Sequence, residues 1–229
     1  MYIIGLDTET CNGHMDSEGK LDLSESLVYD LGYAVIDLRS GEIVTEKSFI
    51  IGDVFIDMKD VMLSAFYADK IPQYWKEYRE GKRKIVSFHT ARRTLMEDMK
   101  NYKVKQVFAH NAFFDLNALN QTERYLTKSK YRFFFRWGTE IVDTLRMARE
   151  TICQTSEYVG FCLRYGYMTK HKKPRVRATA EILYRYLSGN NDFSEAHTGL
   201  EDVKIEKEIF NYIRKHYPEI PLTRRTPKK

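Results

Sequence analysis

The sequence predicts an α/β fold, in which a central sheet of about five strands is flanked by helices. Segments rich in apolar and β-branched residues come early in the chain, whereas segments with apolar residues at helical spacing dominate its second half. Strands connected by helices form a sheet that is covered on both faces. The five segments with strand character are Tyr2–Glu9, Val28–Leu38, Ile43–Ile51, Val104–Ala109 and Thr139–Val142.

The first of these strands ends in two acidic residues. Because side chains alternate between the two faces of a strand, Asp7 and Glu9 should point to the same side. Two adjacent carboxylates repel each other unless a cation lies between them, and hard cations such as Mg²⁺ take oxygen ligands. The alternative is a strand that ends in a polar loop with two solvated acids.

A hairpin and an insertion follow. Residues 39–42 are a turn signal between two strands, so residues 28–51 are predicted to form a hairpin. Residues 53–84 contain short apolar stretches, a proline at Pro72 and a basic run at residues 82–84. We expect an insertion of short helices here.

The remaining segments have helical periodicity. Leu95, Met96 and Met99, for example, recur at helical spacing. Helices are predicted at residues 90–102, 115–126, from about 144, 158–168, 178–187 and 200–216.

Composition restricts the class of protein. Hydrophobic residues make up 43% and charged residues 30% of the 229 residues, as in an ordinary globular protein. We expect one domain at residues 2–217 and a loose basic tail at 218–229. The three cysteines form no CxxC pair, which argues against a zinc site or disulfide framework and favours a reducing, cytoplasmic location. Neither a secretion signal nor a membrane span is expected. The net charge of +5 is compatible with a nucleic-acid partner without establishing one.

A second acidic site follows the strand at residues 104–109. Asn111 is a good helix cap, and Asp115 would then lie near the first turn of a helix. An acid there favours the positive end of the helix dipole, so this stretch alone also fits a purely structural helix start.

A third acidic site lies near the C-terminal end of the chain. Thr198 and Glu201 have the form of a capping box, with Thr198 as the cap. In that frame His197 and Asp202 take two positions that normally touch at a helix start. A capped surface helix with an incidental histidine is the alternative, and a cap at Ser194 would remove this geometry.

Taken together, the three sites resemble the motifs of the DnaQ-like 3′–5′ exonucleases, the DEDDh branch of the ribonuclease H-like superfamily. The resemblance covers about residues 2–212 and implies the ribonuclease H-like mixed sheet. Two departures are the long insertion at 53–84 and Gly199, where many members carry alanine. The three matches occur in the family order, as Asp7-Thr8-Glu9-Thr10, His110-Asn111-Ala112-Phe113-Phe114-Asp115 and His197-x-x-x-x-Asp202.

The resemblance implies a two-metal hydrolase. Two Mg²⁺ or Mn²⁺ ions would stabilise the attacking and leaving oxygens, and His197 would act as the general base. In the family, Asp7 and Asp202 hold the first metal most directly, and Asp7 also touches the second. Two other residues at strand ends, Asp143 and His110, are expected to be structural. The implied metal ligands are Asp7, Glu9, Asp115 and Asp202.

The implied substrate is the 3′ end of a nucleic acid, released as nucleoside 5′-monophosphates. Single-stranded DNA is favoured over RNA, because no residue visibly reads a 2′-hydroxyl. The basic run at residues 170–177 contacts phosphates or is a solvated loop. Two alternative functions stay open: an RNA-processing exoribonuclease and a non-catalytic nucleic-acid-binding or subunit domain. A polymerase or another replication or repair protein also stays open as a partner. The candidate substrate-binding residues are Thr8, Thr10, Asn111 and Phe114.

Overall fold

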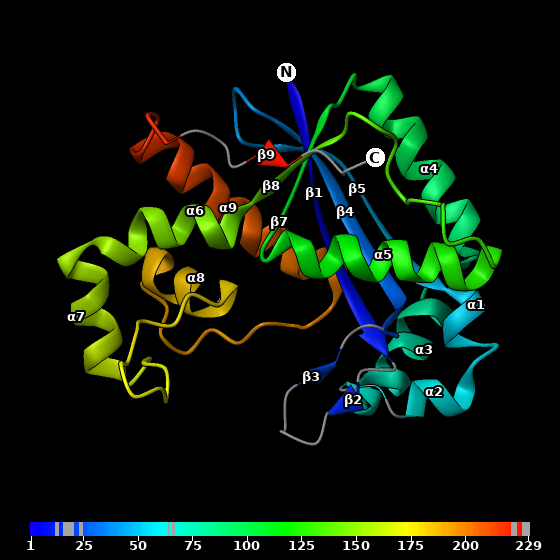
Figure 1. Ribbon diagram of the computed structural model, residues 1–229, viewed down its shortest axis with the longest axis horizontal. Coiled ribbons are helices and arrows are strands. Elements are labelled where there is room, and N and C mark those ends of the chain that lie inside the picture. Colours follow the sequence, from blue (N-terminus) through cyan, green and yellow to red (C-terminus); the bar gives the residue numbers. More distant parts are fainter. Residues whose placement is uncertain are drawn as a thin grey trace.

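A mixed seven-stranded sheet runs through the protein, in the order β6-β5-β4-β1-β7-β8-β9 (Figure 1). The computed structural model describes residues 1–11, 14–15, 21–22, 25–63, 65, 67–220 and 224–225. A separate two-stranded ribbon consists of β2 (His14–Met15) and β3 (Leu21–Asp22). The strands of the main sheet are β1 (Tyr2–Cys11), β4 (Leu27–Asp37), β5 (Ile43–Ile51), β6 (Lys84–Val86), β7 (Gln106–Ala109), β8 (Glu140–Asp143) and β9 (Arg224–Arg225).

The predicted fold class is confirmed, and all five predicted strands are present. β1, β4 and β5 pair antiparallel, whereas β1, β7 and β8 pair parallel, so the sheet is mixed. Besides β2 and β3, the sequence did not reveal two strands of the main sheet, and both lie at its edges: β6 pairs parallel with β5, and β9 pairs antiparallel with β8. With three and two residues, they are too short to show a period of two.

Helices cover both faces of the sheet, and the alternation along the strands separates two cores. Ile4 and Leu6 of β1 face the core that includes α4 and α5, whereas Ile3 faces the core that includes α6 to α9. The first face is covered by α4 (Phe88–Asn101) and α5 (Ala112–Thr127). The second group is α6 (Thr144–Glu150), α7 (Ser156–Tyr165), α8 (Ala180–Ser188) and α9 (Gly199–His216), with η2 (Ile152–Gln154) between α6 and α7.

The predicted insertion consists of short helices, as expected. They are α1 (Gly52–Phe55), α2 (Lys59–Leu63), η1 (Ala68–Lys70) and α3 (Ile71–Arg79). The predicted loose tail differs in part, because Arg224–Arg225 pairs with the free edge of β8, while residues 221–223 and 226–229 lie outside the described ranges. Within the described ranges, none of the helices is long and apolar enough to cross a membrane.

Two glycines let α9 approach the sheet closely. A Cβ atom on Gly32 of β4 would lie 2.1 Å from the backbone nitrogen of Leu200, and one on Gly199 would lie 2.9 Å from the carbonyl oxygen of Asp7. Contacts this short do not occur, so any larger side chain would push the helix away. The absence of alanine at position 199 therefore has a local reason, and the close approach brings the start of α9 next to the acidic end of β1.

Candidate active site

Three carboxylates converge where β1 meets the start of α9. One ligand atom each of Asp7, Glu9 and Asp202 lies within 4.8 Å of the others. Asp7 and Glu9 share a face of β1, as the alternation predicted. Asp202 lies in the first turn of α9, which packs on the side of the sheet to which this face points. The structure thus brings together three of the four predicted metal ligands.

Burial and mutual repulsion make these acids hard to ionise. Burial is the main cause that raises the pKa of Glu9 to about 9 and that of Asp202 to about 8. The pKa of Asp7 lies well above its usual range, because of burial and then of the charges of Asp115, Glu206, Glu9 and Asp202. Among the described residues, Asp202 Oδ1 has no hydrogen-bond partner. Crowded carboxylates with an unpaired buried oxygen fit a hard divalent cation.

The fourth predicted ligand, Asp115, sits slightly apart from this cluster. It lies in the first turn of α5, which packs on the other face of the sheet. Its Oδ1 accepts hydrogen bonds from the backbone N–H of Thr8 (3.0 Å) and from the Thr8 hydroxyl (2.8 Å). Burial still raises the pKa of Asp115 to about 7. Asp115 is thus joined to the cluster by its hydrogen bonds with Thr8, which lies between Asp7 and Glu9 in the chain.

His197 lies immediately before α9, with a left-handed backbone (φ 50°). Its backbone N–H hydrogen-bonds to the Asp202 carboxylate, so the two predicted partners do meet. Its ring stacks on Tyr67, with centroids 4.6 Å apart and planes 16° from parallel. The Nδ1 atom lies 3.7 Å from Glu195 Oε2, and burial lowers the pKa of His197. The imidazole therefore stays neutral to lower pH than a free one.

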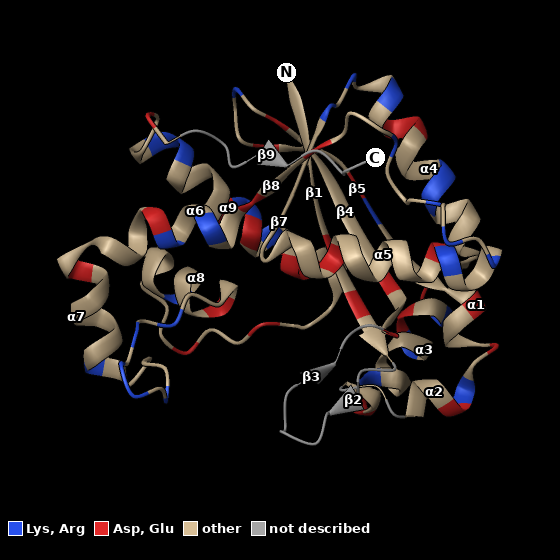
Figure 2. Cartoon of the chain, in the orientation of Figure 1, with Lys and Arg blue, Asp and Glu red and all other residues tan. Residues whose placement is uncertain are grey.

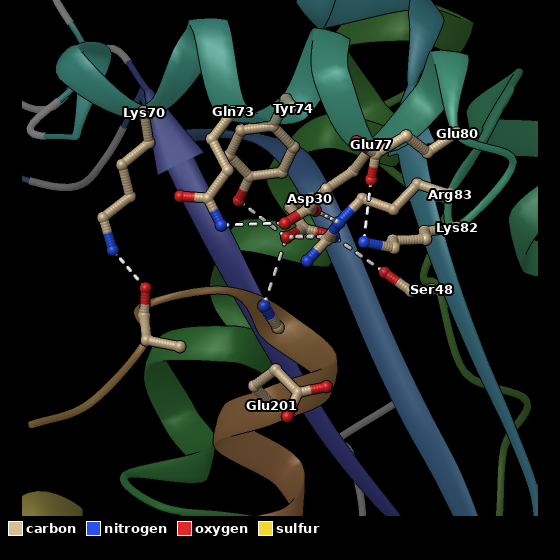
Figure 3. Close-up of polar contacts among 12 residues, drawn as sticks. Asp30, Ser48, Lys70, Gln73, Tyr74, Glu77, Glu80, Lys82, Arg83 and Glu201 are labelled. Carbon is tan, nitrogen blue, oxygen red and sulfur yellow. Dashed lines mark hydrogen bonds and ion pairs between the residues drawn. The ribbon is translucent and has the colours of Figure 1, made fainter. Parts of the chain in front are cut away.

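The predicted capping box is wrong. Thr198 is at the N-cap position, but its side chain accepts no capping hydrogen bond, and Glu201 pairs with Lys204 instead. The N-terminal N–H of α9, on Gly199, donates to Asp30 of β4 at 3.1 Å (Figure 3). A distant buried carboxylate thus replaces the local cap, which sequence spacing cannot reveal.

A cavity of about 530 Å³ opens over the three acids. Of the candidate substrate-binding residues, Thr8, Asn111 and Phe114 line it, whereas Thr10 is not among the described lining residues. Basic and polar side chains are also among its lining residues: Arg149, Thr169, Arg177 and Thr179. Figure 2 shows the basic loop between α7 and α8, to which Arg177 belongs.

Two neighbouring residues are structural. Asp143 caps α6, because its Oδ1 accepts from Leu145 N (3.1 Å) and Arg146 N (3.3 Å), which confirms the structural prediction. His110 is also structural as expected: Nε2 lies 2.7 Å from the Ala178 carbonyl oxygen, and burial lowers its pKa to about 4. Asn111 is at the predicted N-cap position of α5, but with φ 68° its side chain makes no capping hydrogen bond.

Sequence reasoning missed several residues of this cavity. Glu206 is buried, lines the cavity and leaves Oε2 without a hydrogen-bond partner among the described residues. Its position four residues after Asp202, on the same face of α9, was a usable signal. No sequence signal pointed to Tyr67 or Glu195, because they reach the site from an insertion and a loop.

Comparison with solved structures identifies the architecture. No protein-family model and no curated protein sequence matches the chain. The nuclease domain of 3′hExo, a DEDDh family member bound to rAMP, matches with a TM-score of 0.58 at 14% identity, covering 100% of this chain and 96% of that one. E. coli Exonuclease I in complex with a dA16 oligonucleotide matches with a TM-score of 0.52 at 12% identity, covering 95% of this chain and 41% of that one. A structure described as 3′-end specific recognition of histone mRNA stem-loop by 3′-exonuclease matches with a TM-score of 0.59 at 14% identity, covering 100% of this chain and 71% of that one. The chain therefore has the fold of the DEDDh 3′-exonucleases.

Proposed function

We propose that this protein is a divalent-metal-dependent 3′–5′ exonuclease that removes nucleoside 5′-monophosphates from single-stranded DNA. The observation that carries the proposal is the convergence of Asp7, Glu9 and Asp202 within 4.8 Å, in a cavity that His197 also lines. A purely structural role for these acids gives no reason to bring three repelling carboxylates together, two of them buried and one half-buried.

Asp7, Glu9 and Asp202 would hold the metal, with Asp115 at its margin through Thr8. When bound, Mg²⁺ or Mn²⁺ supplies Lewis acidity: it lowers the pKa of water and stabilises the charge that develops on the phosphate oxygens. Binding would also remove the repulsion that raises the pKa values of these carboxyl groups.

His197 is the general base in this proposal. Water attacks the terminal phosphorus, its proton moves to the imidazole, and the bond from phosphorus to the 3′ oxygen of the preceding nucleotide breaks. A neutral ring is needed to accept the proton, which its lowered pKa supports. Because Glu195 faces Nδ1 at 3.7 Å, Nε2 is the nitrogen that takes the proton.

The cavity fits one unstacked nucleotide. Its volume is about 530 Å³, and its lining includes Phe114, which suits a base, and Arg149 and Arg177, which suit a phosphate. A paired end would first have to open, at a cost of a few kcal/mol. This supports a single-stranded 3′ end as the substrate.

The test is digestion of oligonucleotides labelled at the 5′ end, with Mg²⁺ or Mn²⁺ and with EDTA. We expect a ladder that shortens from the 3′ end, disappears with EDTA, and develops faster on a single strand than on a blunt duplex. An RNA of the same sequence is digested in parallel, and the faster of the two rates identifies the substrate. This arm is needed because one structural neighbour was solved with rAMP and another with DNA. Binding without hydrolysis in every arm would favour a non-catalytic domain, and a polymerase partner stays a prediction.

His197→Ala tests the base directly. We expect turnover to fall by about 10²–10⁴-fold, the usual contribution of a positioned base, while metal affinity stays the same. An unchanged rate would exclude His197 from this role.

A further inference from the structure

The insertion reaches the candidate active site through one aromatic ring. Tyr67 lies just before η1 and lines the cavity together with the three acids. Its ring covers one face of the His197 imidazole, 4.6 Å away and nearly parallel. No other ring stack of this kind among the described residues joins the insertion to a residue of the cavity.

A second contact holds the loop that carries His197. The Lys70 ammonium, in η1, donates a hydrogen bond to the backbone carbonyl of Ala196 (Figure 3). His197 follows directly with φ 50°, a left-handed conformation that is uncommon for a residue with a side chain. Lys70 and Tyr67 thus act on adjacent residues, one on the backbone and one on the ring.

A third contact fixes the insertion relative to α9. The Asp30 carboxylate accepts from the Tyr74 hydroxyl (2.7 Å) and from Arg83 (2.8 and 2.9 Å), both in or next to α3. The same carboxylate accepts from the N–H of Gly199, two residues after His197. Figure 3 shows these groups meeting between the insertion, β4 and the start of α9. A movement of the insertion would therefore move Tyr67 relative to the start of α9.

We propose that the insertion positions the general base, with Tyr67 as the positioning residue of the His197 ring and Lys70 as that of its backbone. Stacking covers one face of the ring and leaves its two nitrogens at the edges: Nδ1 lies 3.7 Å from Glu195 Oε2, and Nε2 is the nitrogen that takes the proton in the proposed mechanism. Without Tyr67, the imidazole would rotate away from the cavity. The inference rests on the proposed function, and neither contact can be anticipated from the three acidic motifs.

The test is a double-mutant cycle of Tyr67→Ala and His197→Ala, measured as kcat and KM with Tyr67→Phe as the conservative variant. We expect Tyr67→Ala to lower kcat by about 10–100-fold, the usual cost of a misplaced group, with KM and the Mn²⁺ affinity from calorimetry unchanged. Tyr67→Phe should restore kcat to within about threefold, because it keeps the ring. In the His197→Ala background, Tyr67→Ala should have no further effect. Equal losses in both backgrounds would overturn the proposal.

Tyr78→Ala is the matched control, since Tyr78 is an exposed tyrosine on α3 of the same insertion. It should leave kcat unchanged, and a loss as large as that of Tyr67→Ala would overturn the proposal. Lys70→Met should lower kcat less than Tyr67→Ala does.

A readout without catalysis separates this inference from the proposed function. The proton on Cε1 of His197 should show an upfield ring-current shift in the NMR spectrum, assigned with His197→Ala. The shift should be kept in Tyr67→Phe and lost in Tyr67→Ala, even if the wild-type protein hydrolyses no substrate. An identical shift in Tyr67→Ala would show that the ring is not held by Tyr67.

Discussion

Glu9 and Asp30 are directly opposite each other on β1 and β4, yet they have different surroundings. Asp30 receives hydrogen bonds from Tyr74, Gly199 and Arg83, which sits 2.8 Å away with its side chain 6% exposed. Glu9 instead faces Asp202 and Asp7, and its most important cation is the more distant Lys70. Asp30 and its partner Arg83 therefore form a matched group, in which the protein itself supplies the cation. The acids around Glu9 have no such partner among the described residues and form an unmatched group: Asp7, Glu9, Asp202 and Glu206. The difference shows that facing positions on two paired strands can hold an ion pair on one strand and part of a cluster of unpaired acids on the other.

The largest expected effect comes from removing one charge of the unmatched group. Asp7→Asn should lower the rate of hydrolysis by about 10³-fold or more, because the metal would lose a central ligand. The same change should raise the melting temperature of the metal-free protein, since it removes repulsion among buried acids. Activity assays and thermal unfolding in EDTA measure both. Glu201→Gln, at an exposed position beside Asp202, is the control. A lower melting temperature in Asp7→Asn would contradict the comparison.

The matched group should respond in the opposite way. Arg83→Met leaves Asp30 buried without its cation, and should lower the free energy of unfolding by about 3–5 kcal/mol. Adding Asp30→Asn should recover part of this loss, because the remaining donors can bind a neutral amide oxygen. Urea unfolding measures the three variants, with Lys82→Met as an exposed control in the same segment. No recovery in the double variant would show that the ion pair is not the source of the loss.

The unmatched group should also make the metal-free protein sensitive to pH. The folded-state pKa values of Glu9 (about 9) and Asp202 (about 8) lie above those of the unfolded chain. As the pH rises from about 4 to 9, the unfolded chain loses these protons first, so the free energy of unfolding should fall. Below about pH 4 both states are protonated and the penalty is absent. Urea unfolding in EDTA at several pH values should show the fall, and saturating Mg²⁺ should reduce it. A stability that rises over this range would contradict the assignment.

The smallest expected effect on stability comes from Glu206, which belongs to the unmatched group although it is part of none of the three family motifs. Burial raises its pKa well above the usual range, with Asp115 the strongest of the charges that add to this. Glu206→Gln should stabilise the metal-free protein by about 0.5–2 kcal/mol at pH 8. Glu208→Gln, on an exposed part of the same helix, should change stability little. Equal effects of the two substitutions would remove Glu206 from the group.

Much of the fold and part of the site follow from the sequence alone. The period-two and helical patterns identify the five longer strands and the main helices, because each pattern is local to its segment. The shared orientation of Asp7 and Glu9 follows from alternation along one strand, and the structural roles of Asp143 and His110 follow from their places at strand ends.

Only the tertiary structure decided which distant residues complete the site. The Gly32–Gly199 contact sets how closely α9 lies on the sheet, and so places Asp202 beside Asp7. Asp30 replaces the predicted capping box, and Tyr67 reaches His197 from 130 residues earlier in the chain. Such contacts depend on how elements pack, and packing distances leave no periodic trace in the sequence. The acids and the histidine can therefore be identified as motifs in the sequence, whereas the residues that contact them from distant parts of the chain, such as Asp30 and Tyr67, cannot.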